Sequence, residues 1–479
     1  MELEMQQKGS FPKKHLSTTI PIILILISTS DIIAQQPENG GRRIYEEQLR
    51  VRLDQQQAAA RQIGLDAGGW FDFAFFTYDD AFGKERTLRQ YNLRLWASYT
   101  HRGVHTFYVR GMMGFDDWNP GDNPNGDTGD KFHQPKLERA WYRFDYDRLI
   151  RNQTGKDPKA GFKVEVGRDF YVIGTGLVLA IPLDAVKLTG RVGDLTVNGL
   201  IAKTITHTYN IDDSPAVRDH MDRCFYGIEV KYTGIDKHEP FFYYLWQNDH
   251  TKPWGGILPQ QYSYDSEYLG FGSTGSIPYL PRLRYELEMV FESGKSFPEG
   301  ANKQEKIRAM ALDVLLEYLF PVKYRPRVAF RYTWGSGDSD RRLSSTSTIG
   351  GNQPGTNDKA FNAFGFRDTG VAFAPEIGNL HTFQIDFSAR PLEQIKLFKK
   401  METGTKVFFY TKDKRTGAIS DTTATVHSSW VGWEWDVYLN WRITSDVSLT
   451  VRYGVFSPGD AFVDRDHRQF FYTGITYSF

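Results

Sequence analysis

The chain has 479 residues, of which 58 are Lys or Arg and 58 are Asp or Glu, so its formal net charge is zero. The absence of a basic excess disfavours a nucleic-acid-binding protein, and the single cysteine, Cys224, excludes an intramolecular disulfide and a cysteine-rich metal site. Aromatic residues make up 15% of the sequence, although its mean hydropathy is −0.48. Few soluble enzymes combine these two properties, whereas a transmembrane β-barrel has aromatic girdles, a polar lumen and glycine-rich loops.

The N-terminal segment has the order of a secretory signal. Two lysines precede the apolar run 20–27, and a Ser- and Thr-rich stretch then leads to Ala34. We expect residues 1–34 to be a signal peptide cleaved near Ala34, and the polar residues 35–65 to form a periplasmic leader. Because no later apolar run is long enough for a transmembrane helix, a mature chain that spans a membrane must do so as a closed barrel.

Residues 66–479 follow a period of two. Segments of about ten residues alternate apolar with polar side chains, and clusters of Gly, Asp, Asn and Pro separate them. From Arg282 to Glu292, Leu, Tyr, Met and Phe side chains share one face, and Arg and Glu side chains share the other. In a barrel the apolar face contacts lipid, and the charged face lines a lumen whose water hydrates the charges. The sequence therefore predicts an all-β fold, a transmembrane antiparallel β-barrel.

The alternating segments add up to about eighteen strands with short periplasmic turns and long extracellular loops. They are predicted to begin near residues 70, 88, 104, 136, 161, 184, 195, 223, 240, 266, 281, 306, 327, 379, 395, 430, 446 and 468. An even number of strands leaves both ends of the barrel on the periplasmic side. The short connections fall near 101–103, 193–195, 321–326, 391–394 and 443–446, and the long ones, on the other side, span 116–133, 250–264, 337–378 and 412–429.

The final segment closes the barrel pattern. Alternate residues from Phe471 to Phe479 share one face, and the chain ends on an aromatic residue. This ending resembles the C-terminal strand that the outer-membrane assembly machinery recognises. We therefore expect that machinery as a partner, outer-membrane lipid and lipopolysaccharide around a monomeric barrel, no nucleic acid and no cofactor.

Several short motifs follow one another along the chain, and their combined order and spacing is more informative than any one of them. They are Gly167-Arg168-Asp169 followed by Gly174-Thr175-Gly176-Leu177, then Asp184-Ala185-Val186-Lys187-Leu188, Tyr285-Glu286-Leu287-Glu288 with Glu292-Ser293-Gly294, Gly335-Ser336-Gly337-Asp338, and Gly432-Trp433-Glu434-Trp435-Asp436. Together they resemble the alginate export family of outer-membrane porins over most of residues 160–479. The resemblance implies an outer-membrane location and passive passage of solutes, with an alginate-like anionic polysaccharide as one candidate solute.

Charged residues on the lumen side of the strands are the candidate pore lining. Arginine suits an anionic solute because its planar guanidinium pairs carboxylates in a fork and stays charged. Arg168 faces lipid by its parity unless a bulge intervenes, and we keep it as a candidate near the outer rim. The full set is Arg94, Arg110, Arg139, Arg143, Arg168, Arg284, Glu286, Glu288, Arg331, Arg390, Glu434, Asp436, Arg442 and Arg452.

Two solute hypotheses remain open. Arginines clustered without acidic partners would favour export of an anionic polysaccharide, whereas a wall of mixed charge would favour a general porin for small ions and metabolites. A barrel enzyme is a third alternative, but the chain has no G-x-S-x-G motif and no paired Asp and His signature, so we expect no enzyme activity.

One loop concentrates oxygen ligands. Asp116, Asp117, Asp127 and Asp130 are weak calcium candidates, but the EF-hand spacing of ligands and glycine fails there. We therefore expect a solvated loop and no metal site.

Overall fold

The computed structural model describes residues 63–124, 129–205, 221–252, 263–301, 303–348 and 351–479. The predicted signal peptide and almost all of the predicted leader lie outside the described residues. The expected start of the barrel at residue 66 falls inside the first strand, which begins at Ile63. Among the described residues, no helix is both long enough and apolar enough to cross a membrane.

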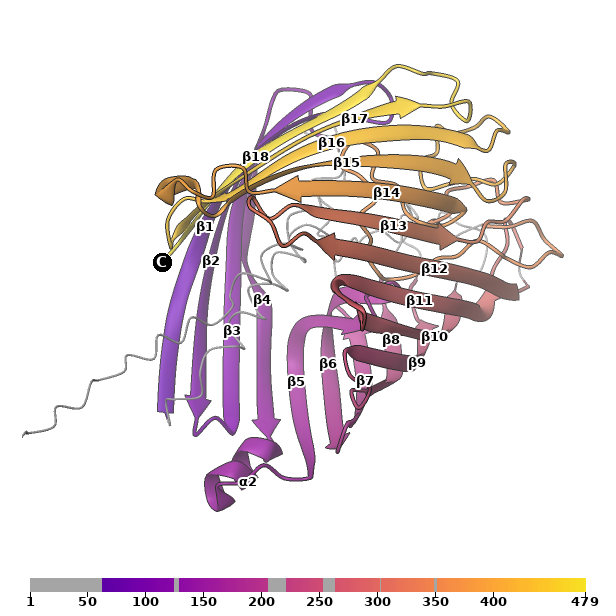
Figure 1. Ribbon diagram of the computed structural model, residues 1–479. Helices are drawn as coiled ribbons and strands as arrows, with labels where there is room; N and C mark the ends of the chain where they lie inside the picture. Colours follow the sequence, from indigo (N-terminus) through magenta and orange to yellow (C-terminus); the bar gives the residue numbers. More distant parts are fainter. Residues whose placement is uncertain (1–62, 125–128, 206–220, 253–262, 302, 349–350) are drawn as a thin grey trace, which may run out of the picture.

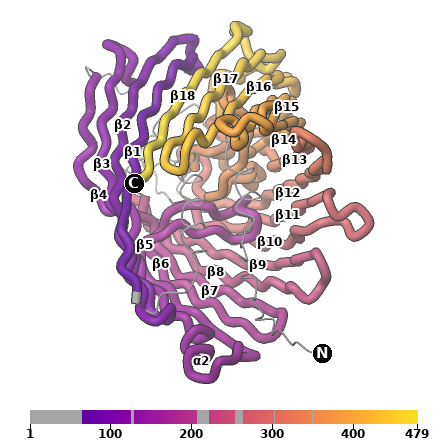
Figure 2. Tube along the Cα trace, turned by 60° about the vertical axis from the view of Figure 1, so that its left-hand side comes forward, coloured from indigo at the N-terminus to yellow at the C-terminus, as the bar shows by residue number. Residues whose placement is uncertain are grey.

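Eighteen antiparallel strands form one closed sheet, as predicted (Figures 1 and 2). Strands that are consecutive in the chain pair with each other, and β18 pairs with β1 to close the ring. The strands are β1 (Ile63–Asp79), β2 (Glu85–His101), β3 (His105–Trp118), β4 (Lys131–Asp145), β5 (Ala160–Ile173), β6 (Leu179–Val192), β7 (Leu195–Thr204), β8 (Arg223–Tyr232), β9 (His238–Asp249), β10 (Tyr264–Ile277), β11 (Leu280–Ser296), β12 (Glu305–Leu319), β13 (Arg327–Gly335), β14 (Leu380–Ala389), β15 (Met401–Lys412), β16 (Trp430–Arg442), β17 (Val447–Pro458) and β18 (Arg468–Ser478).

The two faces of each strand differ as the alternation predicts. In β11, Leu287 and Phe291 are 42% and 40% exposed, whereas Glu288 and Glu292 on the other face are 0% and 3% exposed. An apolar exposed face and a polar covered face are the reverse of a soluble protein, and they fit a barrel with lipid outside and a polar interior.

Most strands begin within three residues of the predicted position, but β1 begins seven residues early, β6 begins five residues early, and β4 and β15 also differ. β4 begins five residues early, at Lys131, because the strand continues through Pro135, which is tolerated at a strand edge. β15 begins late, at Met401, because the preceding turn contains a short 3-10 helix, η3 (Lys396–Phe398). Phe398 of η3 stacks on Trp441 with ring centroids 4.8 Å apart, so an aromatic contact replaces the predicted tight turn.

One helix, α2 (Tyr146–Thr154), occupies the turn between β4 and β5 at the end of the barrel that carries the short turns (Figure 1). The side chain of Asp145 accepts a hydrogen bond from the Arg148 backbone N–H and caps its N-terminus. Gly155, at φ 72°, ends the helix in the left-handed conformation. The alternation pattern identifies strands only, so it did not predict α2.

β4 and β5 pair over only six residue pairs, Ala140–Asp145 against Lys163–Arg168. Beyond Arg168, β5 pairs only with β6 among the described strands, and the β5–β6 hairpin bends into the barrel (Figure 1). Gly167 lies at this bend with φ at +134°, and a β-carbon there would lie 2.2 Å from the Ala140 carbonyl oxygen. Only glycine permits this close approach of the two backbones.

We predict that Gly167→Val destabilises the barrel by on the order of 2 kcal/mol, because valine cannot adopt this backbone conformation without strain. Gly190→Val is the matched control, since the nearest atom to a β-carbon at Gly190 is 3.9 Å away. The measurement is the midpoint of urea unfolding in detergent micelles. Equal midpoints for the two variants would contradict the role assigned to Gly167.

Candidate functional site

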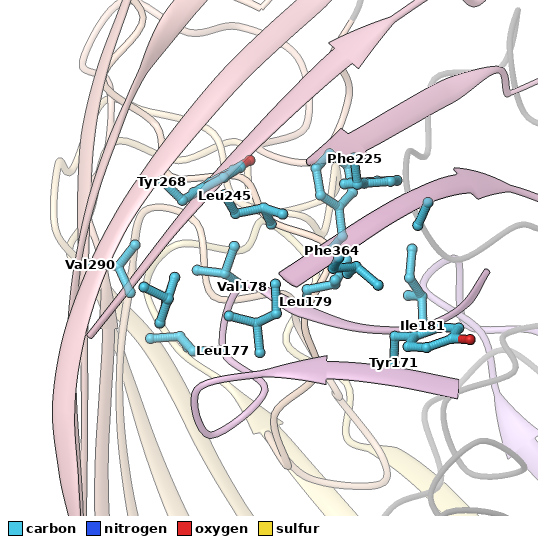
Figure 3. Close-up of a cluster of buried hydrophobic side chains, with 14 of the residues drawn as sticks. Tyr171, Leu177, Val178, Leu179, Ile181, Phe225, Leu245, Tyr268, Val290 and Phe364 are labelled. Atoms are coloured by element: carbon cyan, nitrogen blue, oxygen red, sulfur yellow. The ribbon is translucent and has the colours of Figure 1, made fainter. Parts of the chain in front are cut away.

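The long connection between β13 and β14, residues 336–379, folds back inside the barrel. We call its residues 351–379 the lumen loop. Phe361 and Phe364 of this loop are 1% and 0% exposed, and Phe364 packs against Phe225 of β8 with ring centroids 5.1 Å apart. Figure 3 shows Phe364 among the inward side chains of β6, β8 and β10. The barrel interior is therefore partly filled by its own loop.

On one side the lumen loop joins the inner surface of the β5–β6 hairpin. Phe364 forms an isolated parallel bridge with Leu179, its N–H donates to the Val178 carbonyl at 2.8 Å, and its carbonyl accepts from Ala180 N–H at 2.9 Å. Backbone pairing of this kind fixes the loop in register with β6. The loop acts here as an extra strand inside the barrel.

Neighbouring strands bind the same part of the loop through acidic and aromatic side chains. Glu292 of β11 accepts a hydrogen bond from Asn362 N–H at 3.0 Å, and the Tyr268 hydroxyl donates to the Asn362 carbonyl at 2.6 Å. Arg367 of the loop forms ion pairs with Asp313 at 3.1 Å and Glu288 at 3.5 Å. These carboxylates therefore hold the loop instead of lining open water.

On the other side the loop is held by Glu434 of β16. Its Oε1 accepts hydrogen bonds from Val371 and Ala372 N–H at 2.5 and 2.7 Å, and its Oε2 accepts one from Phe373 N–H at 2.8 Å. Successive N–H groups that converge on one carboxylate form an anion-binding nest. Gly370, at φ +108°, makes room for it, because a β-carbon there would lie 2.6 Å from Glu434 Oε1.

Further contacts fix the same stretch of the loop. Lys406 of β15 forms an ion pair with Asp368 at 2.6 Å, and the ring of Phe373 stacks on Phe456 of β17 at 4.1 Å. β6 and β16 lie on opposite sides of an eighteen-strand ring, because they are ten strands apart in one direction and eight in the other. The lumen loop therefore crosses the interior from one wall to the other and narrows the passage.

Two carboxylates outside the strands lie at the root of this connection, Asp338 within it and Asp413 directly after β15. Burial, together with a hydrogen bond with Asp340, raises the pKa of Asp338 to about 6. Burial also raises the pKa of Asp413, but hydrogen bonds from His381, Gly337 N–H and Lys414 outweigh it and hold this pKa well below its usual range. Asp413 thus stays ionised. It fastens the start of the connection, at Gly337, to β14 and β15.

The predicted arginines on the inner wall mostly contact carboxylates, commonly on neighbouring strands. The pairs are Arg94 with Asp72 (2.9 Å) and Glu138 (3.1 Å), Arg110 with Glu138 (2.8 Å), Arg139 with Asp169 (3.5 Å), Arg143 with Glu165 (2.9 Å), Arg284 with Glu317 (3.7 Å), Arg331 with Glu286 (2.9 Å), and Arg390 with Glu402 (3.6 Å). The inner wall is therefore of mixed charge.

The remaining predicted residues have other surroundings. Arg442 donates to the Ser445 carbonyl in the turn after β16, and Arg452 donates to the Asn440 side chain at 2.7 Å. Asp436 is buried beside Glu434 and stands in register with Lys406. The sequence placed a long connection at 337–378 but did not show its path or the role of Arg367, because the contacts that hold Phe361, Phe364 and Phe373 come from strands distant in the chain.

Arg168 lies on the outer surface. It shares a face of β5 with Val166, which is 43% exposed, and its guanidinium pairs with Asp184 at 2.7 Å and donates to the Leu137 carbonyl at 3.1 Å. β5 and β6 pair here without a register shift, so no bulge turns Arg168 inward. Arg168 is therefore not part of the pore lining.

The calcium candidates do not converge. Asp116 and Asp117 are adjacent on β3 and point to opposite faces; Asp116 contacts His133 at 2.7 Å and Asp117 contacts Arg89 at 3.5 Å. Asp127 lies outside the described residues, and Asp130 is exposed. The part of the chain that the structure describes contains no group of three or more His, Cys, Asp or Glu side chains that could hold a metal ion.

A closed eighteen-strand barrel with an apolar exterior, a charged interior and an inward loop defines an outer-membrane channel. Solved structures share the fold: Pseudomonas aeruginosa OccK8 (OprE), with a TM-score of 0.51 and 13% identity over 87% of this chain and 98% of that one, and OccK1 (OpdK), with 0.53 and 8% over 87% and 98%. A structure of OpdK with vanillate is also similar, with a TM-score of 0.52 and 8% identity over 86% and 98%.

The family model for alginate export matches residues 209–475, which is more than half of the chain. The chain therefore belongs to the alginate export family, and it is a channel of the bacterial outer membrane for passive passage of solutes. No curated protein matches it.

We predict that Glu434→Gln loosens the lumen loop. The substitution removes the negative charge, and an NH2 group, which donates, takes the place of one of the two oxygens that accept hydrogen bonds from backbone N–H groups. Amide hydrogen exchange at Val371, Ala372 and Phe373 should accelerate about tenfold or more, in line with the loss of charge-assisted hydrogen bonds. Glu165→Gln is the control, since Glu165 binds Arg143. Unchanged exchange in Glu434→Gln would show that other contacts hold the loop.

Proposed function

We propose that this barrel is a narrow channel for small hydrophilic solutes, with the lumen loop setting its width. The observation that carries the proposal is the attachment of one loop to both walls, through Leu179 of β6 and Glu434 of β16. A strand-like segment fixed across the lumen leaves only part of the cross-section of an eighteen-strand barrel to solutes. Passage is then diffusion through a hydrated path.

The mixed charge of the inner wall supports weak ion selectivity. Each carboxylate next to an arginine cancels much of its long-range field, although the pair creates a strong local field across the passage. Arg331 and Glu286, which are 19% and 39% exposed at the side chain, are the pair we propose to meet the solute. The other predicted pore-lining residues remain proposals of the same kind.

A second candidate is an alginate-like anionic polysaccharide, which membership of the alginate export family favours. A polymer needs a wider path than a small solute, so this function requires the lumen loop to leave its position. The contacts at Glu434 and at Glu292 would then have to break during each passage.

We further propose that the barrel performs no chemistry, is exported by the signal peptide of residues 1–34, and is inserted as a monomer by the assembly machinery. Phe479 supports insertion by the assembly machinery. Its backbone pairs with Gly69 on β1, through hydrogen bonds of 2.9 and 3.0 Å, and its side chain is 58% exposed on the outside. The ring is therefore accessible to a recognition protein.

If solutes pass the pair of Arg331 and Glu286, substitutions of the two residues should have opposite effects on ion selectivity. Arg331→Gln should make the channel more cation-selective, and Glu286→Gln should make it more anion-selective, because each removes one sign of charge from the same pair. The measurement is the reversal potential across a planar bilayer under a salt gradient. If neither variant moves the reversal potential, solutes do not pass this pair.

The solute itself is tested by titrating single wild-type channels with oligouronates. Open, weakly selective conductance without block supports the small-solute channel. Strong anion selectivity with block by oligouronates supports the polysaccharide.

Phe479→Ala should lower the amount of barrel in the outer membrane several-fold, because the side chain read during insertion is lost while the backbone pairing is kept. Phe383→Ala, on an exposed aromatic in the middle of β14, is the control. Quantified immunoblots of outer-membrane fractions measure the effect. Equal amounts of the two variants would contradict recognition through Phe479.

A further inference from the structure

The outer surface of β6–β9 contains a hollow with a volume of about 350 Å³. It arises at Gly199 of β7, which stands in register with Leu188 on one side and Ile228 on the other. No heavy atom lies within 4 Å of a β-carbon built on Gly199. One side chain is thus missing from an otherwise continuous apolar row that faces lipid.

Rigid aromatic side chains form the far wall of the hollow. Tyr226 stacks on Trp246 with ring centroids 5.1 Å apart, and the Tyr244 hydroxyl donates to Glu267 at 2.9 Å. These contacts hold the rings at the wall of the hollow, and the space above Gly199 stays open. The hollow is therefore a preformed apolar groove.

Charged groups lie directly beyond the groove, toward the long-loop end of the strands. Lys203, two residues after Ile201 on the same face of β7, stands in register with Asp184 and pairs with Asp222 at 2.9 Å. Its side chain is 57% exposed. Since a lysine ammonium has three donors, contact with Asp222 leaves capacity for a further anionic group.

We propose that this groove binds one acyl chain of lipid A, the lipid of the outer leaflet, with a lipid A phosphate against Lys203. The long loops mark this end as extracellular, so the leaflet with lipopolysaccharide surrounds it. Since one water occupies about 30 Å³ in the liquid and a methylene group is of similar size, the hollow takes on the order of ten methylene groups.

The shape of the surface favours a lipid chain over a second copy of the barrel. A stable protein interface needs on the order of 1,000 Å² of buried surface, far more than a groove between four strands provides. A single chain fits the notch between Leu188 and Ile228 and adds a head group at Lys203. The occupant is therefore a molecule with an apolar tail and an anionic head.

The test is native mass spectrometry of the full barrel in detergent, after lipid removal and addition of purified lipid A. We compare the wild type with Gly199→Val, which places a side chain in the groove, Lys203→Gln, which removes the charge, and Gly190→Val, an outward glycine of β6 that does not line the groove. Valine fits at Gly199 because the space above it is open and strands favour it.

The wild type and Gly190→Val should retain one lipid A molecule, and Gly199→Val and Lys203→Gln should lose it several-fold. Equal retention in all four proteins would overturn the proposal. So would equal retention of phosphatidylethanolamine and lipid A by the wild type, because the head group would then carry no preference. A change from oligomer to monomer in Gly199→Val would assign the groove to a second copy instead.

Discussion

The interior of this barrel depends on the carboxylate of Glu434, which is fully buried and must be satisfied by hydrogen bonds. Three successive N–H groups of the lumen loop satisfy it, and they also need an acceptor because they lie away from water. Each partner thus removes the other's desolvation cost. The loop's path across the lumen, the burial of Phe373 and the width of the passage all follow from this mutual requirement.

The same alternating strands give the barrel wall an apolar outer face and a charged inner face. Outside, apolar side chains meet lipid, and Gly199 interrupts them to leave a groove below Lys203. Inside, arginines and carboxylates stand side by side, so that each charge has a partner in the wall. Arg168 shows the limit of this division, because it places a charge on the outer surface and pairs it there with Asp184.

The sequence predicted the barrel because period two is a local property of each strand, and the apolar face of β11 is visible in its own residues. The position of η3 and the path of the lumen loop depend on contacts between distant segments, such as Trp441 with Phe398, which no local pattern encodes. The alternation of side chains along β5 was enough to place Arg168 on the outer face. The alternation placed Glu434 on the inner face, but its hydrogen-bond partners became visible only in the structure.

The most direct test of the account is the single-channel conductance of a variant in which residues 360–376 are replaced by a short glycine and serine linker. A loop that crosses and narrows the lumen predicts a several-fold rise in conductance over the wild type, in a barrel that still resists heat in detergent. Unchanged conductance in such a folded variant would show that solutes pass elsewhere and that the loop does not set the width of the channel.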